Sequence, residues 1–153
     1  MPAIQTSYPD VMAAGVPGLV ADASKSRVTS YVAEASPVPF GVPVFQGTKD
    51  NTCVIAGTAN AGTFIGVSVI GKEVRPIINE AVDTYPVGAP VAVMEEGHVW
   101  VTVTSAVTPR AGVYIDASGN FTGTETGNTA LPETVFLTTA AAGGIARIGV
   151  RVA

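Results

Sequence analysis

Charged residues are scarce in this sequence. They make up 13% of its 153 positions, where about 25% is usual for a globular domain. Hydrophobic residues reach 47% and the mean hydropathy is +0.40. Even so, no run approaches the roughly 18 apolar residues of a membrane span, and the longest candidate, FIGVSVIG at 64–71, has the length of a strand. We therefore expect no membrane insertion, and a weakly charged surface of the kind that partner proteins cover.

A basic patch is also missing. The eight lysines and arginines are scattered along the chain and not interleaved with aromatic residues, and the formal net charge is −4. Binding to nucleic acid requires clustered positive charge that neutralises phosphates. The sequence therefore predicts no nucleic-acid partner.

Cysteine is nearly absent, since Cys53 is the single one in the chain. One cysteine excludes an intramolecular disulfide and a cysteine-based metal site. Because Cys53 lies in a β-branched run, we expect a buried, unreactive thiol. The first ten residues, MPAIQTSYPD, lack the basic start and apolar middle of a signal peptide, so we expect synthesis in the cytoplasm.

Short β-branched runs separated by glycine and proline turns fill residues 25–153, and no long 3.6-residue apolar period interrupts them. This pattern predicts an all-β fold, either a small β-barrel or a jelly-roll-like sandwich, in a single domain over 25–153. The clearest alternation is in a closing strand, where one face is expected to be buried and the other exposed to water. The buried face holds Ala146, Ile148, Val150 and Val152, and the other holds Arg147, Gly149 and Arg151. Residues 36–47 contain three prolines, which we expect to confine that stretch to a sheet edge or a bend.

The first 24 residues combine three prolines with many apolar side chains, whereas a disordered tail would be polar. Proline-stiffened apolar segments suit docking along another surface at low entropic cost. We therefore predict an extended N-terminal arm over 1–24. Its expected contact residues are Tyr8, Val11, Met12, Val16, Leu19 and Val20.

The only histidine, His98, follows Glu95, Glu96 and Gly97. Such a cluster could ligate a metal, but neighbouring residues on a turn rarely converge on one ion, and no second histidine completes a typical site. We interpret residues 95–98 as the polar tip of a hairpin in which Gly97 supplies the turn. The lone tryptophan, Trp100, is either a core residue or a contact for a partner.

Motifs for catalysis and cofactor binding are not found. The chain has no Gly-x-Ser-x-Gly, no phosphate-binding loop and no dinucleotide fingerprint. We predict no catalytic residue, no cofactor and no metal.

Five segments in a fixed order resemble the structural cement, or head decoration, proteins of tailed bacteriophages. They are YPDVMAAGVPGLVADAS, TSYVAEASPVPFGVPV, GTFIGVSV, YPVGAPVAVMEEGHVWVTVTSAVTPRAGVYI and GIARIGVRV. Together they span roughly residues 8–152, and glycine and valine recur in every motif.

The resemblance implies a protein made in the host cytoplasm that binds the outer surface of the assembled head and clamps neighbouring subunits of the major capsid protein. It places residues 8–23 at the capsid-facing or subunit-swapped side. Symmetric lattice sites favour a homotrimer, with a dimer as the next choice. Two alternatives stay open: another self-assembling virion component such as a tail, fibre or shell subunit, and an enzyme or small-ligand binder.

Overall fold

The computed structural model describes residues 13–57, 62–71 and 81–152. These residues form eleven strands joined by turns and contain no helix, so this part of the chain offers no helical membrane span. The all-β prediction is confirmed. Tyr8, Val11 and Met12 lie outside the described residues.

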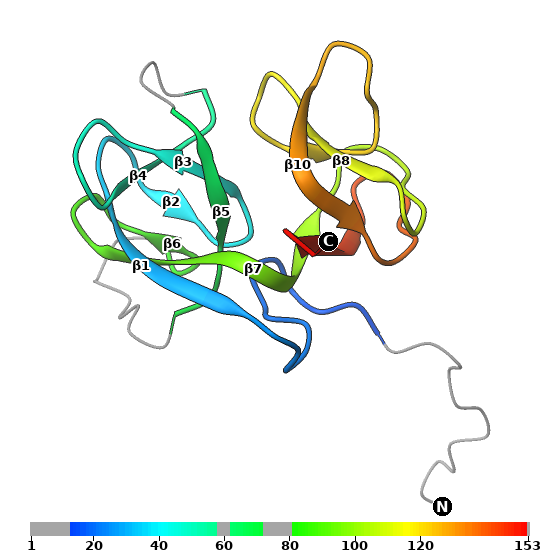
Figure 1. Cartoon of the computed structure of the whole chain (residues 1–153), viewed down its shortest axis with the longest axis horizontal. Coiled ribbons are helices and arrows are strands. Elements are labelled where there is room, and N and C mark those ends of the chain that lie inside the picture. The colour runs from blue at the N-terminus through cyan, green and yellow to red at the C-terminus, as the bar shows by residue number, and fades with distance from the viewer. Residues whose placement is uncertain (1–12, 58–61, 72–80, 153) are drawn as a thin grey trace, which may run out of the picture.

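Five strands form a closed barrel in the first lobe of the molecule (Figure 1). Their order is β1-β4-β3-β5-β7, and a further pairing between β1 and β7 closes the ring. The bounds are β1 (Arg27–Ala33), β3 (Pro43–Gln46), β4 (Thr52–Ile55), β5 (Phe64–Ser68) and β7 (Pro90–Thr102). A separate two-stranded sheet of β2 (Val38–Pro39) and β6 (Thr84–Tyr85) belongs to the same lobe.

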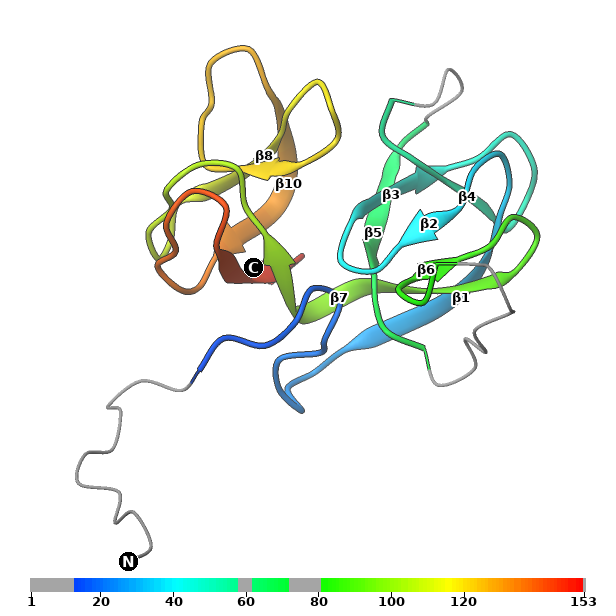
Figure 2. The ribbon, with the colours of Figure 1, turned by 180° about the vertical axis from the view of Figure 1, so that it is seen from behind.

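A second lobe uses the far half of β7 (Figure 2). From β7 the sheet continues in the order β11-β10-β8-β9. These strands are β8 (Gly112–Ile115), β9 (Phe121–Thr122), β10 (Thr129–Phe136) and β11 (Ile145–Val150). A parallel bridge between Val103 and Phe121 brings β9 back beside the end of β7. Strand β7 is therefore shared by both lobes.

The interpretation of residues 95–98 as a hairpin tip is wrong. They lie inside the continuous 13-residue strand β7. Gly97 has a φ of 134°, and the β1–β7 register shifts between Arg27 and Val28 at this point. A glycine and a bulge bend a strand without ending it. Strand β7 therefore passes from the first lobe into the second, pairing with β1 and β5 in its first half and with β11 in its second.

The expectation that prolines keep residues 36–47 out of a central ladder is also wrong for β3, which lies between β4 and β5. Pro43 is the first residue of the strand and pairs with Val67. At a strand start the missing N–H is tolerated. In the closing strand β11, Ala146, Ile148 and Val150 are buried as predicted, but Gly149 of the opposite face is buried as well, and the strand ends before Val152. Residues 116–120 form the bend between β8 and β9.

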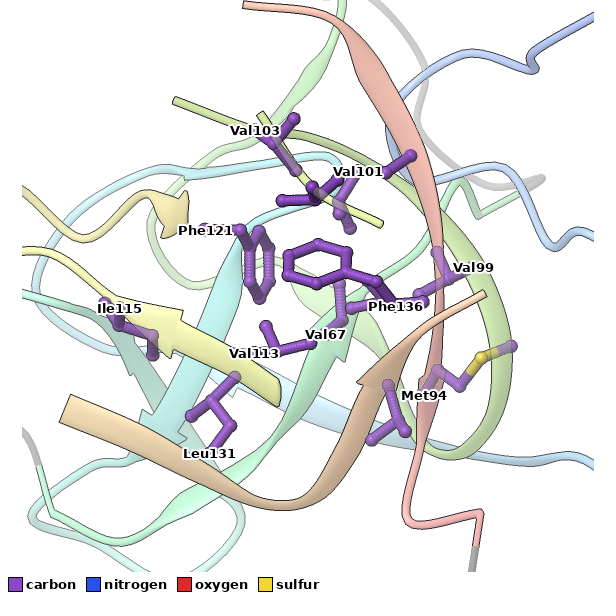
Figure 3. Close-up of a cluster of buried hydrophobic side chains, with 14 of the residues drawn as sticks. Val67, Met94, Val99, Val101, Val103, Val113, Ile115, Phe121, Leu131 and Phe136 are labelled. Atoms are coloured by element: carbon purple, nitrogen blue, oxygen red, sulfur yellow. The ribbon is translucent and has the colours of Figure 1, made fainter. Parts of the chain in front are cut away.

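Two hydrophobic clusters fill the lobes. The smaller one lies in the first barrel and includes Val44, Cys53, Tyr85 and Val91. The larger one centres on Phe121 and Phe136 and reaches across to Val67 of β5 (Figure 3). Burial of each such large side chain contributes about 1.5–3 kcal/mol. The larger cluster therefore joins the two lobes through a common core.

The side chain of Arg151 adds a polar link between the lobes. From just beyond β11 its guanidinium donates to the carbonyl oxygens of Phe64 and Ile65 in β5, at 3.1 and 3.2 Å. A third contact joins it to the Glu95 carbonyl at 3.4 Å. The end of the second lobe is thereby tied to β5 and β7 of the first lobe, beside the junction where the N-terminal segment lies.

Candidate binding surface

The described N-terminal segment, residues 13–24, meets β7 at the junction of the two lobes (Figure 2), and residues 18–21 lie along the edge of this strand. Val20 and Val99 form an antiparallel bridge. The Gly18 N–H donates to the Trp100 carbonyl at 2.8 Å, and the Trp100 N–H donates to the Leu19 carbonyl at 3.0 Å. Strand β1 pairs with the earlier part of β7, from Pro90 to Glu96. The N-terminal segment thus makes backbone hydrogen bonds with residues 98–100 of β7, which lie past the part of β7 that β1 covers.

Close backbone contact with the first lobe holds the same segment. Gly18 and Gly41 face each other: a Cβ added at Gly41 would lie 2.6 Å from the Gly18 nitrogen. Both have positive φ, 82° and 71°, a conformation that favours glycine. The Gly18 carbonyl also accepts a hydrogen bond from the Ile70 N–H at 2.9 Å. The segment is therefore fixed to β7 on one side and to the first lobe on the other.

Trp100 packs beneath this segment. A Cβ added at Gly15 would lie 2.6 Å from Cδ1 of the indole ring and 3.0 Å from the Leu19 side chain. Trp100 is half-buried and is not part of either hydrophobic cluster. The indole ring is therefore a platform for the chain's own N-terminal segment.

Asp22 ties the segment to β7 through side chains. Its carboxylate lies 2.6 Å from Nδ1 of His98 and 3.6 Å from the Arg147 guanidinium. Hydrogen bonds from Ser24 and from His98 hold the pKa of Asp22 well below its usual range. The Ser24 hydroxyl also lies 3.3 Å from Nδ1 of His98. Since serine and aspartate share one ring nitrogen, this group is not arranged as a Ser-His-Asp relay, which needs both nitrogens.

Apolar side chains of the docked segment nevertheless point outward. Val16 is 54% exposed, Leu19 42% and Val20 39%, and the neighbouring Ile70 is 40% exposed. The structure thus brings Val16, Leu19, Val20 and Trp100 together at the lobe junction. Sequence reasoning missed Ile70, which lies in the strand-length run at 64–71, and Gly41, whose closeness to Gly18 only the fold reveals.

Glu95, the first residue of the polar cluster, is held by its own chain. It accepts a hydrogen bond from the Tyr31 hydroxyl at 2.6 Å and pairs with Arg27 at 2.7 Å. Burial alone would raise the pKa of Glu95, but these contacts outweigh it and the pKa is lowered.

Burial raises the pKa of the Cys53 thiol to about 11. Within residues 13–57, 62–71 and 81–152, no three His, Cys, Asp or Glu side chains gather where they could hold a metal ion.

Comparison with known proteins gives one family. The family described as structural cement protein (E217 gp24/Pam3 gp6) matches residues 4–151. A chain of the solved structure titled "The capsid of Myoviridae Phage XM1" has the same fold, with a TM-score of 0.72 and 17% sequence identity. The match covers 98% of each chain. No curated protein matches this sequence.

Proposed function

Because this chain belongs to the phage structural cement protein family, we propose that it binds the outer surface of the assembled phage head. There it clamps neighbouring subunits of the major capsid protein and so stabilises the shell. The family match over residues 4–151 is the observation that carries this proposal. It favours capsid reinforcement over a tail or fibre subunit because the family is described as a cement protein, and over an enzyme because that description is a structural one.

The surface at the lobe junction supports this role. Val16, Leu19 and Val20 are exposed on a segment whose backbone is already fixed. Pre-ordered apolar groups lose little conformational entropy when a partner covers them. We propose that these residues contact the shell, together with Tyr8, Val11 and Met12 of the preceding stretch. Trp100 supports this surface from below.

Many copies on a symmetric shell act together, so a modest affinity at each site suffices. We propose that the protein acts as a symmetric homo-oligomer, with a trimer favoured over a dimer, because lattice sites have rotational symmetry. We also propose that residues 1–24 act as an arm on a β domain over 25–153. Sedimentation of the purified protein distinguishes a trimer from a dimer.

A binding assay with purified heads that lack this protein tests the function. Added protein should sediment with the heads and raise the temperature at which they break open. A variant without residues 1–12, which keeps the segment that is hydrogen-bonded to β7, should stay folded and lose head binding. If that variant binds heads as well as the full chain, the proposed role of the arm is wrong; if the full chain does not bind heads, the proposed function itself is wrong.

A further inference from the structure

A groove of about 500 Å³ lies between the docked N-terminal segment and the neighbouring end of the first lobe. The lining includes Val16, Pro17, Pro39, Phe40, Ile70 and Asp83. Its floor is rigid: Phe40 packs edge-to-face on the buried ring of Tyr85, with ring centroids 5.1 Å apart. The Tyr85 hydroxyl in turn donates to the Val69 carbonyl at 2.6 Å.

The apolar surface continues beyond this groove. A second hollow of about 350 Å³ is lined by Pro37, Ala81, Pro86 and Val87, and both hollows share Thr84. Val87 is 52% exposed. Prolines carry no N–H, so these walls offer apolar side chains and few backbone donors. An occupant must therefore be mainly apolar where it touches them.

Asp83 is the one charged residue among the described residues that line either hollow. It is exposed and forms no ion pair with any residue in the described part of the chain. Its backbone is fixed, because its carbonyl accepts a hydrogen bond from the Phe40 N–H at 3.0 Å. A carboxylate placed firmly at the edge of an apolar groove favours a cation on the partner.

We infer that the groove takes an extended, apolar segment of the major capsid protein that carries a lysine or arginine opposite Asp83. This inference rests on the proposed function and names the part of the surface that recognises the shell. A second copy of this chain fits less well. A twofold contact between two grooves would bring Asp83 of one copy towards Asp83 of the other, whereas in the favoured trimer a different face of the next copy would have to supply the cation.

The chain's own basic residues also argue against a second copy. Lys25 and Arg27 pair with Glu96 and Glu95, and Arg147 lies beside Asp22. The Arg151 guanidinium is taken up by backbone carbonyls. Four of the six basic residues in the described ranges are thus engaged within the molecule, which leaves Lys49 and Arg110 as the described candidates that a second copy could offer.

The test compares three variants of the full chain for binding to purified heads that lack the protein. Ile70→Glu places a charge in the groove and should weaken binding about tenfold or more. Val32→Glu is the matched control: Val32 is 41% exposed against 40% for Ile70 but does not line the groove, so its affinity should stay near wild type. Asp83→Asn should bind more weakly and with a shallower dependence on salt concentration.

Several results would overturn the inference while leaving the proposed function intact. One is wild-type binding to heads together with equal affinities for Ile70→Glu and Val32→Glu. Another is that Ile70→Glu sediments as a smaller oligomer than wild type but still binds heads. That result would mean that the groove holds a second copy of this chain. If the head binding of Asp83→Asn depends on salt concentration as steeply as that of wild type, no cation on the partner pairs with Asp83. Equal melting temperatures of the two glutamate variants control for folding.

Discussion

The carboxylate of Asp22 lies 2.6 Å from Nδ1 of His98, so an N-terminal side chain is paired with the strand that both lobes share. Replacing Asp22 by asparagine removes the negative charge. Since both side chains are partly exposed, with 34% and 21% of their surface accessible, we expect a loss of about 1 kcal/mol or less in the free energy of unfolding. Chemical denaturation of wild type and Asp22→Asn at neutral pH measures this difference.

The same pair predicts a dependence on pH. The pKa of Asp22 is lower in the folded protein than in the unfolded chain, so its contribution is complete above the unfolded pKa and is lost as the pH falls below about 4. The difference in stability between wild type and Asp22→Asn should therefore shrink on acidification. A difference that stays constant from pH 7 to pH 3 would contradict the role given to this carboxylate.

The approach of Gly18 to Gly41 predicts a large effect of a small change. Gly41→Ala combines a positive φ with a methyl group 2.6 Å from the Gly18 nitrogen, and we expect a loss of about 2–4 kcal/mol. Gly88→Ala is the control: Gly88 has a φ of 81° but nothing within 4 Å of an added Cβ, so its loss should be about 1 kcal/mol. Equal losses in thermal unfolding would argue against the close contact.

Trp100 reports the docking of the N-terminal segment because it is the only tryptophan in the chain. Gly15→Ala places a methyl group 2.6 Å from the indole ring and should displace the segment. We expect the fluorescence emission to shift to longer wavelength as water reaches the ring. Gly127→Ala, where an added Cβ meets nothing within 4 Å, should leave the spectrum unchanged; a similar shift in both variants would mean that Gly15 does not cover Trp100.

Cys53 gives a probe of the first barrel. Its side chain is fully buried, and burial raises its pKa to about 11. Because the thiolate is the reactive form, a thiol reagent at pH 8 should not label the native protein and should label it fully in denaturant. Rapid labelling without denaturant would show that the first barrel opens readily.

The strands and their burial were largely predictable, because β-branched alternation reflects local physics that tertiary structure did not override. The hairpin predicted at residues 95–98 was wrong because a short polar stretch with a glycine has the same composition in a hairpin tip as in a bent strand. The prediction that prolines exclude residues 36–47 from a central ladder failed at Pro43. A proline is tolerated as the first residue of a strand, and the neighbouring strands decide where β3 begins. The docking of residues 13–24 on their own lobes depends on Gly18 meeting Gly41, 23 positions apart, which no local pattern encodes.

The position of this protein on purified virions tests the account most directly. Image reconstruction and quantitative protein analysis of particles should find it in a fixed ratio to the major capsid protein, on the outer face of the head, with the groove beside Ile70 and Asp83 against a capsid segment. Particles that contain none of it, or that carry it only inside the head or on the tail, would contradict the proposed function.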